Sequence, residues 1–415
     1  MRDMKDSGIE WIHDIPASWA VMPNKYLMHK IKRIRPVYGG EDILSLTMKG
    51  VIVRDLDAGG KMPTSFNGYQ ELYPGNLLMC LFDIDVTPRC IGLIKQFGLS
   101  SPAYSQFVLN DGVDAAYYCY YYTMLDNDKT LLHLAKNLRH SLTEEQLGAV
   151  PTVVPPIEEQ KRIAAYLDDK CAETDSLAAD IQAQIDALEQ YKRSVITEAV
   201  TKGLNPDAEM KDSGIQWIGM MPSHWDCIRG KYILKYIQKP VREDDGVITC
   251  FRDGEVTLRS NRREDGFTVA DKEIGYQGID VGDLVVHGMD GFAGAIGISD
   301  SRGKASPVLN VLDTKQNKSY IMYFLRSMAY SDVFLALATG IRVRSCDLRW
   351  NKLAELFYPV PPIEEQDAIV QHIDNVLRKV NEVIAQKKDQ LSVLEAYKKS
   401  LIFEYVTGKK EVPLA

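Results

Sequence analysis

The hexapeptide Pro155-Pro156-Ile157-Glu158-Glu159-Gln160 occurs a second time, 206 positions later, as Pro361-Pro362-Ile363-Glu364-Glu365-Gln366. The same displacement relates Met4-Lys5-Asp6-Ser7-Gly8-Ile9 to Met210-Lys211-Asp212-Ser213-Gly214-Ile215. Two copies of 206 residues account for nearly all of the 415 residues. The chain is therefore expected to be a tandem duplication in which both copies fold on one plan.

Single positions between the repeated segments support this interpretation. At the same displacement, the pairs are Trp11 with Trp217, Pro16 with Pro222, Trp19 with Trp225, and Lys25-Tyr26 with Lys231-Tyr232. Further along, Gly75-Asn76-Leu77 corresponds to Gly282-Asp283-Leu284, now 207 positions apart. The displacement is 205 between Ile91-Gly92 and Ile296-Gly297, and it is 206 again between Leu142 and Leu348. Displacements that change by one and later return are typical of loop insertions, so we expect a shared scaffold whose loops differ.

Each hexapeptide is expected to open a long helix. Two prolines favour an extended approach, and the two glutamates after them favour a helix N-terminus. Leu167, Thr174, Ile181, Leu188 and Val195 then repeat every seven residues, which is typical of a coiled coil. The second helix has a similar pattern, but Lys387 and Lys388 interrupt it. A pseudo-twofold duplication would place the two helices antiparallel, with one domain near each end. The alternative is a parallel pair with both domains together, but the connection over 205–225 would then have to run back the full helix length, so the antiparallel arrangement is expected.

The fold class expected is α+β, with two mixed α/β domains separated by two long antiparallel coiled-coil helices. The predicted segments are a first domain over residues 1–154, a first long helix over 155–204, a second domain over 205–360 and a second long helix over 361–415.

Within the first domain, short β-rich segments bounded by turn residues predict strands. They are 43–47, 51–53, 77–82, 91–94, 106–109 and 117–123. The spacing of apolar residues over 129–139 predicts an amphipathic helix. In the second domain, the glycine-rich stretch 288–297 predicts a hairpin loop.

Composition limits the class of protein. The net charge is −8, but residues 155–209 carry six more acidic than basic groups while the two domains are nearly neutral. A neutral domain can still present a basic face to nucleic acid. The seven cysteines have no metal-ligand or disulfide spacing, and no apolar segment is long enough for a membrane span, so we expect a cytoplasmic protein with no membrane association.

The common sequence motifs of catalysis are absent. The chain has no phosphate-binding Gly-x-x-x-x-Gly-Lys-Ser/Thr loop, no His-Glu-x-x-His and no Gly-x-Ser-x-Gly elbow. No catalytic residue and no metal ligand is therefore predicted. A binding or scaffolding protein is favoured.

The ordered set of duplicated motifs resembles the DNA specificity subunit of type I restriction–modification enzymes. The motifs that carry the resemblance are Trp-Ile, Pro and Trp, then Lys-Tyr, then Gly-Asn/Asp-Leu, then the Pro-Pro-Ile-Glu-Glu-Gln helix start, each present twice. The resemblance covers essentially the whole chain. It implies two target-recognition domains, each reading one half of a bipartite, asymmetric site in double-stranded DNA.

The resemblance also implies partners. Two methyltransferase subunits would dock on the helices and on the leading segments, and motor/nuclease subunits would complete the restriction complex. S-adenosylmethionine would bind the methyltransferase subunits, with no cofactor in this chain. The chain would not itself be an enzyme. An enzyme with an unrecognised site and a protein scaffold that never contacts DNA are the alternatives.

Arginine, lysine and polar side chains in loops can contact phosphates and base edges, so most of the candidate DNA-binding residues are of these types. The first-domain candidates are Lys49, Arg54, Thr87, Arg89, Tyr104, Arg139 and His140. The second-domain candidates are Arg252, Arg259, Arg262, Arg263, His287, Met289, Asp290, Phe292, Arg302, Lys304, Arg342 and Arg344.

Candidate partner-binding residues come from the repeated motifs. They are Trp11, Trp19, Trp217, Trp225, Glu158, Glu159, Gln160, Glu364, Glu365 and Gln366. The simpler alternative for the tryptophans is that they anchor the core of each domain. A helix of about 40 residues would be roughly 60 Å long, which limits the distance between half-sites to under two turns of DNA.

Overall fold

The computed structural model describes residues 2–57, 63–135, 139–263, 274–336 and 348–413. The chain divides into two compact units, one containing Met1–Ile181 with Asp389–Ala415 and the other containing Gln182–Lys388. Each unit therefore contains one mixed domain together with one end of both long helices. The predicted domain boundaries, by contrast, assigned each helix to a segment of its own.

The first unit is built on a four-stranded antiparallel sheet in the order β4-β11-β8-β9. These strands are β4 (Met28–Ile31), β8 (Leu77–Met79), β9 (Ile91–Leu93) and β11 (Ser105–Leu109). The paired strands around it are β1 (Met4–Asp6) with β2 (Asp14–Pro16), β3 (Ala20–Pro23) with β12 (Pro151–Val154), β5 (Leu44–Thr47) with β6 (Gly50–Val53), and β7 (Gln70–Leu72) with β10 (Gly98–Ser100). The helices of this domain are η1 (Asn24–Tyr26), α1 (Ala115–Asn127), η2 (Thr130–Leu134) and α2 (Glu144–Ala149).

The second unit repeats this plan with the sheet order β16-β23-β20-β21. These strands are β16 (Leu234–Ile237), β20 (Leu284–His287), β21 (Ile296–Ile298) and β23 (Leu309–Thr314). The pairs around it are β13 (Met210–Asp212) with β14 (Met220–Pro222), β15 (Asp226–Arg229) with β24 (Phe357–Val360), β17 (Ile248–Cys250) with β18 (Val256–Leu258), and β19 (Gln277–Ile279) with β22 (Gly303–Ala305). Its helices are α4 (Gly230–Ile233), α5 (Arg259–Arg262), η3 (Gly291–Ala293), α6 (Lys318–Tyr330), α7 (Val333–Ala336) and α8 (Trp350–Leu353). The hairpin predicted over 288–297 is confirmed, since it joins the antiparallel strands β20 and β21.

The strand predicted over 117–123 is wrong, because these residues belong to α1. The tyrosines favour a strand by propensity, but the Asp114 side chain caps the helix by accepting a hydrogen bond from the Tyr117 amide. Tyr117, Tyr118, Tyr121 and Tyr122 are all buried. Tertiary packing around the whole helix therefore overrides local propensity.

The helix predicted over 129–139 is also wrong in extent. Lys129 adopts a left-handed backbone conformation with φ of 49°, which stops α1 from continuing. Only the short 3-10 helix η2 (Thr130–Leu134) follows it. Residues 136–138 lie outside the described residues.

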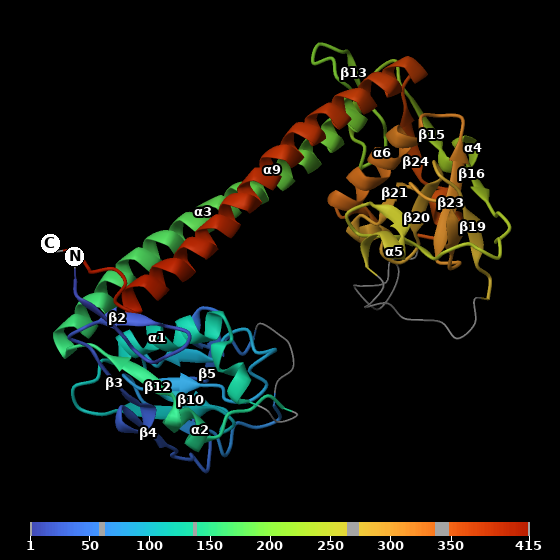
Figure 1. Ribbon diagram of the computed structural model, residues 1–415. Helices are drawn as coiled ribbons and strands as arrows, with labels where there is room; N and C mark the ends of the chain where they lie inside the picture. The colour runs from blue at the N-terminus through green and yellow to red at the C-terminus, as the bar shows by residue number, and fades with distance from the viewer. Residues whose placement is uncertain (1, 58–62, 136–138, 264–273, 337–347, 414–415) are drawn as a thin grey trace. The chain divides into compact units, whose positions relative to one another are not determined.

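The two long helices are α3 (Ile157–Lys202) and α9 (Ile363–Val406), with 46 and 44 residues. In the first unit, the Tyr166 hydroxyl near the start of α3 lies 3.2 Å from that of Tyr405 near the end of α9. Further along α3, and correspondingly earlier in α9, the Lys398 ammonium donates to the Asp175 carboxylate at 2.6 Å. The helices therefore run in opposite directions within this unit (Figure 1).

The second unit shows the same direction of pairing. Its core contains Ile196 and Val200 from α3 together with Ile369 and Ile373 from α9. Lys387, which interrupts the apolar pattern, donates a hydrogen bond to the Gln184 side chain across the helix pair. Where Lys387 interrupts the apolar repeat of α9, a polar contact with α3 thus replaces apolar packing.

A buried glutamine joins each domain to the helix that follows it. Gln160 is fully buried; its side-chain oxygen accepts from the Asp114 amide at 2.8 Å, and its nitrogen donates to the Pro155 carbonyl at 2.8 Å. Gln366 in the second unit accepts from the Asn317 amide at 2.9 Å and donates to the Pro361 carbonyl at 2.9 Å. Asp114 and Asn317 are the N-caps of α1 and α6. In each unit, one glutamine side chain therefore holds the start of the domain helix next to the start of the long helix.

We expect Gln366→Ala to lower the free energy of unfolding by about 1–3 kcal/mol, because the half-buried Asn317 amide and the buried Pro361 carbonyl would both lose their partner. Gln371→Ala is the matched control, since Gln371 is exposed on the same helix, and it should change stability by no more than about 0.5 kcal/mol. Urea unfolding followed by circular dichroism measures both. Equal stability of the two variants would contradict a structural role for Gln366.

Candidate nucleic-acid interface

The second unit has a groove of about 720 Å³ lined by the β17–β18 hairpin, α5 and the end of β20. Six predicted DNA-binding residues line it: Arg252, Arg259, Arg262, Arg263, His287 and Asp290. They are separated by up to 38 positions in the sequence, as Arg252 and Asp290 show. The fold therefore gathers most of the described second-domain candidates into one basic surface.

The local fold explains how the arginines reach the groove. Arg252 lies in the turn between β17 and β18, which closes with hydrogen bonds from the Phe251 amide to Glu255 and from the Gly254 amide to Phe251. Gly254 has φ of +93°, and a Cβ there would lie 2.4 Å from the Arg326 guanidinium, so glycine is required. Helix α5 begins directly after β18 and carries Arg259 and Arg262.

The ion pairs in the groove are exposed. Arg252 lies 2.9 Å from Asp290 and its side chain is 68% exposed. Arg262 lies 2.7 Å from Asp253 and 2.8 Å from Glu255, and its guanidinium stacks over the Phe251 ring at 4.1 Å. Exposed pairs are worth little, so a phosphate or base edge can replace the carboxylate at small cost.

His287 contributes a neutral imidazole to the groove. Its Nδ1 lies 3.2 Å from the Met289 amide and 2.9 Å from the Asp290 amide, so Nδ1 accepts and the proton resides on Nε2. Burial lowers the pKa of His287, which favours this neutral form at neutral pH. The imidazole Nε2–H is therefore a donor that suits a base acceptor.

Arg302 has a different environment from the groove arginines. It lies 2.8 Å from Asp245 and 2.7 Å from Asp280, and its side chain is only 22% exposed. Asp280 also accepts from Lys239 at 2.8 Å. Hydrogen bonds from Lys239 and then Arg302 lower the pKa of Asp280 to about 2. The structure gives Arg302 a structural role in tying together three loops.

The remaining second-domain candidates lie apart from this groove lining. Lys304 is half-buried in β22, and Phe292 packs against the domain core. Met289 is 52% exposed beside the groove residue Asp290. Arg342 and Arg344 lie outside the described residues.

In the first unit, Arg89 has a structural role. Its guanidinium lies 3.2 Å from Asp126 and 3.1 Å from Asn127, and its side chain is 14% exposed. Lys129 donates to the same carboxylate at 2.7 Å and to the Thr87 carbonyl at 2.6 Å. The backbone of Thr87 is thereby fixed to the end of α1.

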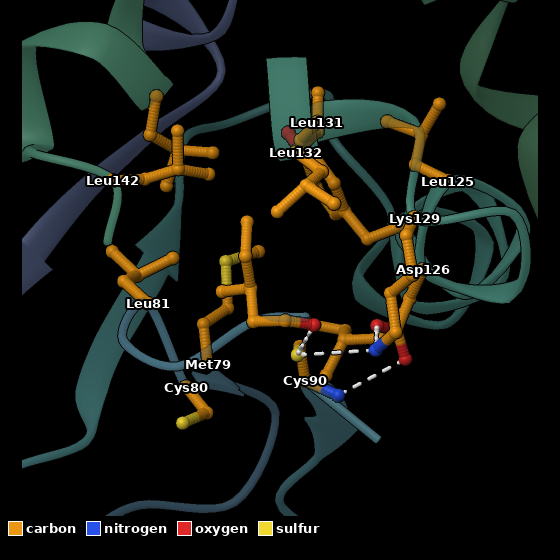
Figure 2. Close-up of a pocket in the computed structure, with 14 residues that line it drawn as sticks. Met79, Cys80, Leu81, Cys90, Leu125, Asp126, Lys129, Leu131, Leu132 and Leu142 are labelled. Atoms are coloured by element: carbon orange, nitrogen blue, oxygen red, sulfur yellow. Dashed lines mark hydrogen bonds and ion pairs between the residues drawn. The ribbon is translucent and has the colours of Figure 1, made fainter. Parts of the chain in front are cut away.

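Figure 2 shows a small cavity next to this network. Its volume is about 50 Å³, and apolar side chains such as Leu81, Leu132 and Leu142 surround it. Lys129 and Asp126 close one side beside Cys90, whose pKa is raised to about 12 by burial. A space of this size and lining is a packing defect of the core and does not suit a ligand.

The other first-domain candidates lie in loops. His140 lies 2.7 Å from Asp85, and the Arg139 carbonyl accepts from the Asp83 amide at 2.9 Å, so the loops around residues 85 and 140 are held together. Lys49 is exposed in the β5–β6 turn. Arg54 is half-buried, and the half-buried Tyr104 ring stacks near Phe82 at 6.2 Å.

The predicted partner-binding residues divide into buried and exposed groups. Trp19 and Trp225 are buried in the two cores, and Trp19 donates to Glu159 at 2.9 Å. Trp11 and Trp217 pack partly buried against the same cores, and Glu365 lies 2.8 Å from His224. Together with the buried Gln160 and Gln366, these contacts favour anchoring of the domain core. Glu158 and Glu364 are exposed and remain accessible.

The described part of the chain offers neither a metal site nor a membrane span. Among those residues, no group of three or more His, Cys, Asp or Glu side chains could hold a metal ion. None of the described helices has the length and apolar character to cross a membrane.

Sequence reasoning missed several groove residues. Thr249, Tyr276 and Ser306 line the groove beside the arginines. They come from three separate segments, and single polar residues in short strands and loops give no sequence signal of a shared surface.

Comparison with known proteins supports the resemblance. No family model matches the chain. It is 23% identical over 282 residues to the putative type I restriction enzyme MjaX specificity subunit of Methanocaldococcus jannaschii, a match covering 66% of this chain and 62% of that protein. It is 25% identical over 276 residues to the type I restriction enzyme MjaVIII specificity subunit of the same organism, covering 62% of each. The matched part thus spans less than two thirds of either relative.

A solved structure shares the fold. A chain from a structure described as showing complex assembly and conformational transition of the type I restriction–modification system superimposes with a TM-score of 0.68. The superposition covers 95% of this chain and 99% of that one, at 14% sequence identity. The predicted resemblance to type I restriction enzyme specificity subunits is therefore confirmed.

We expect Arg302→Ala to lower the free energy of unfolding by about 2–4 kcal/mol, because buried Asp245 would lose its charge partner. Arg252→Ala is the matched control and should change the free energy of unfolding by no more than about 0.5 kcal/mol, since that pair is exposed.

The same ion pairs predict how stability depends on pH. A carboxylate whose pKa is lowered in the folded protein stabilises the fold at pH values above its pKa in the unfolded chain, and this stabilisation is lost as the pH falls through the pKa in the folded protein. The thermal midpoint of the wild type should therefore fall between about pH 4 and pH 2, and less steeply for Arg302→Ala.

Proposed function

We propose that this relative of type I restriction enzyme specificity subunits reads DNA sequence for a restriction–modification complex. The observation that carries the proposal is the second-unit groove, where Arg252, Arg259, Arg262 and Arg263 meet His287 and Asp290. Arginine presents two parallel donors that match the O6 and N7 atoms of guanine, and it also binds phosphates. A surface with four arginines and a neutral histidine suits both tasks.

The position of the groove in the duplicated scaffold supports specificity. In both units the central sheet has the same strand order, and one candidate residue of each unit lies at, or in the loop after, a strand end that faces away from the long-helix junction. His287 ends β20, and in the first unit the loop carrying Thr87 follows the equivalent strand β8. The loops differ in sequence between the copies. Two different loop sets on one scaffold suit two different half-sites.

Each unit would read one half of a bipartite, asymmetric site in double-stranded DNA. In the first unit the candidate readers are Lys49, Arg54, Thr87, Tyr104, Arg139 and His140. The long helices would set the separation of the two half-sites. A helix of 46 residues is about 69 Å long, and domains that lean inward from it would place the half-sites about one turn of DNA apart.

The chain would contribute no chemistry of its own. Two methyltransferase subunits would dock on the long helices and leading segments and would supply the bound S-adenosylmethionine and adenine modification. Motor/nuclease subunits would add cleavage. The exposed Glu158 and Glu364 at equivalent helix starts support a docking surface for two copies of one partner.

Methylome sequencing of a strain that expresses this chain with its methyltransferase partner tests the bipartite site. We expect a modified motif with two specified halves of a few base pairs each, centred about one helical turn apart. A single contiguous motif would contradict the two-reader arrangement. Loss of all modification when the chain is deleted is the control.

Replacing groove arginines tests which half-site the second unit reads. In the assembled complex, Arg252→Ala with Arg263→Ala should relax specificity at one half-site only, by about 1–3 kcal/mol for each base edge that an arginine reads. The slope of log affinity against log salt should become less negative, by about one for each phosphate that the variant no longer neutralises. Arg242→Ala, at an exposed position outside the groove lining, is the control. Unchanged specificity in the double variant would remove the groove from DNA reading.

A further inference from the structure

The glycines of the stretch 288–297 lie where backbone from another hairpin comes very close. A Cβ at Gly294 would lie 2.7 Å from the Arg252 carbonyl oxygen, and a Cβ at Gly297 would lie 1.9 Å from the Gly254 carbonyl oxygen. Neither distance leaves room for a side chain, and glycine in a strand or hairpin often marks such a close approach. The turn that joins β17 to β18 therefore packs its backbone directly on the β20–β21 hairpin.

Arg326 of α6 holds the same turn at its central residue. One terminal nitrogen of the guanidinium donates to the Asp253 carbonyl at 2.7 Å, and Nε donates to the Tyr330 hydroxyl at 2.8 Å. Three consecutive carbonyls, those of residues 252–254, are therefore held by close packing or by a hydrogen bond. The turn has little freedom to change its orientation on the β20–β21 hairpin.

The turn in its place orients two of the groove arginines. Arg252 belongs to the turn itself. Asp253 has two roles, since its carbonyl accepts from Arg326 while its carboxylate lies 2.7 Å from Arg262. The Arg262 guanidinium also stacks over the ring of Phe251, at the start of the turn. A shift of the turn would therefore move both arginines together.

Helix α6 connects the turn to the long helices within the second unit. Its N-cap, Asn317, is bound by Gln366 at the start of α9. Near its other end, the Tyr330 ring lies 5.3 Å from the Arg193 guanidinium of α3 and 5.7 Å from that of Arg326. A continuous series of contacts thus runs from both long helices through α6 to the turn. The orientation of the groove arginines is set relative to these helices.

The first unit holds a candidate DNA-binding loop in a comparable way with different residues. Lys129, just after α1, donates to the Thr87 carbonyl at 2.6 Å, and Asp126 accepts from the Cys90 amide at 3.0 Å. In both units, a cation near the end of the domain helix thus binds a backbone carbonyl of a candidate loop. A contact to backbone does not depend on the loop side chains, so the loop sequence can differ while its position is kept.

We propose that Arg326 is a positioning residue for DNA reading, which holds the β17–β18 turn so that Arg252 and Arg262 meet base edges. The inference rests on the proposed function, in which the groove reads one half-site. An arginine that reads guanine must align two donors with O6 and N7, and such sites need their side chains held within about 0.5 Å. Attraction to phosphates carries no sequence information and tolerates a displaced turn.

The test uses the full chain assembled with its methyltransferase partner and DNA duplexes that carry single base changes in either half-site. Arg326→Ala should reduce discrimination against changes in the second-unit half-site about fivefold or more. Discrimination in the other half-site should stay as in the wild type. The slope of log affinity against log salt should also be unchanged, because Arg326 does not itself neutralise a phosphate.

Two conservative variants separate positioning from a general loss of stability. Arg326→Lys keeps a cation that can donate to the Asp253 carbonyl, as Lys129 does to the Thr87 carbonyl, so it should recover part of the lost discrimination. Tyr330→Phe removes only the hydroxyl that accepts from Arg326 and should have a smaller effect in the same direction. If Arg326→Ala fails to fold in thermal unfolding, Tyr330→Phe carries the test. Arg242→Ala, exposed and outside the groove lining, is the charge-matched control and should change neither half-site.

The remaining outcomes each overturn the inference. A less negative salt slope for Arg326→Ala would make Arg326 a direct phosphate contact. An equal loss of affinity for cognate and altered duplexes would make it a general structural residue. If Arg326→Ala keeps full discrimination while Arg252→Ala with Arg263→Ala relaxes one half-site, this inference alone fails. If that double variant also keeps full discrimination, the proposed reading by the groove fails with it.

Discussion

The buried hydrogen bonds of Gln160 and Gln366 are the constraint on which each unit depends. A glutamine amide has one acceptor and two donor positions, and here it connects the cap of a domain helix to the carbonyl that precedes the long helix. The carbonyl is buried and the cap amide is half-buried, so leaving either unpaired is costly. The direction in which the long helix leaves the domain is therefore fixed by backbone groups and does not depend on the sequence of the loops.

This joint explains how the two copies could diverge elsewhere. The sheet order, the helix caps and the core tryptophans repeat, while the loops at the opposite end of each sheet share almost no sequence. In the second unit those loops bring four arginines to one groove. Because the joint is remote from the groove, substitutions in the groove need not disturb the attachment of the helix, and a half-site can change while the scaffold is kept.

Burial distinguishes arginines that look alike in the sequence. Arg252 and Arg302 both pair with aspartates, but Arg252 is 68% exposed and Arg302 only 22%. An exposed pair can exchange its carboxylate for a phosphate at little cost, whereas a pair that includes a buried Asp245 stabilises the loops only while it is intact. In the first domain the same reasoning separates Arg89, paired with the nearly buried Asp126, from the exposed Lys49.

The sequence by itself determined the duplication, the two long helices and the resemblance to specificity subunits, because repeated motifs and heptad spacing are local signals that survive without coordinates. It also indicated most of the short strands and the hairpin at 288–297. It could not identify α1, since Tyr117–Tyr122 favour a strand by propensity and become helical through the Asp114 cap and the burial of Tyr117, Tyr118, Tyr121 and Tyr122. Only the tertiary structure decided which arginines line the groove and which tie loops together, because ion pairs such as Arg302–Asp245 join residues 57 positions apart. It also decided that Tyr26 and Tyr232 are exposed, since burial depends on packing that no short motif encodes.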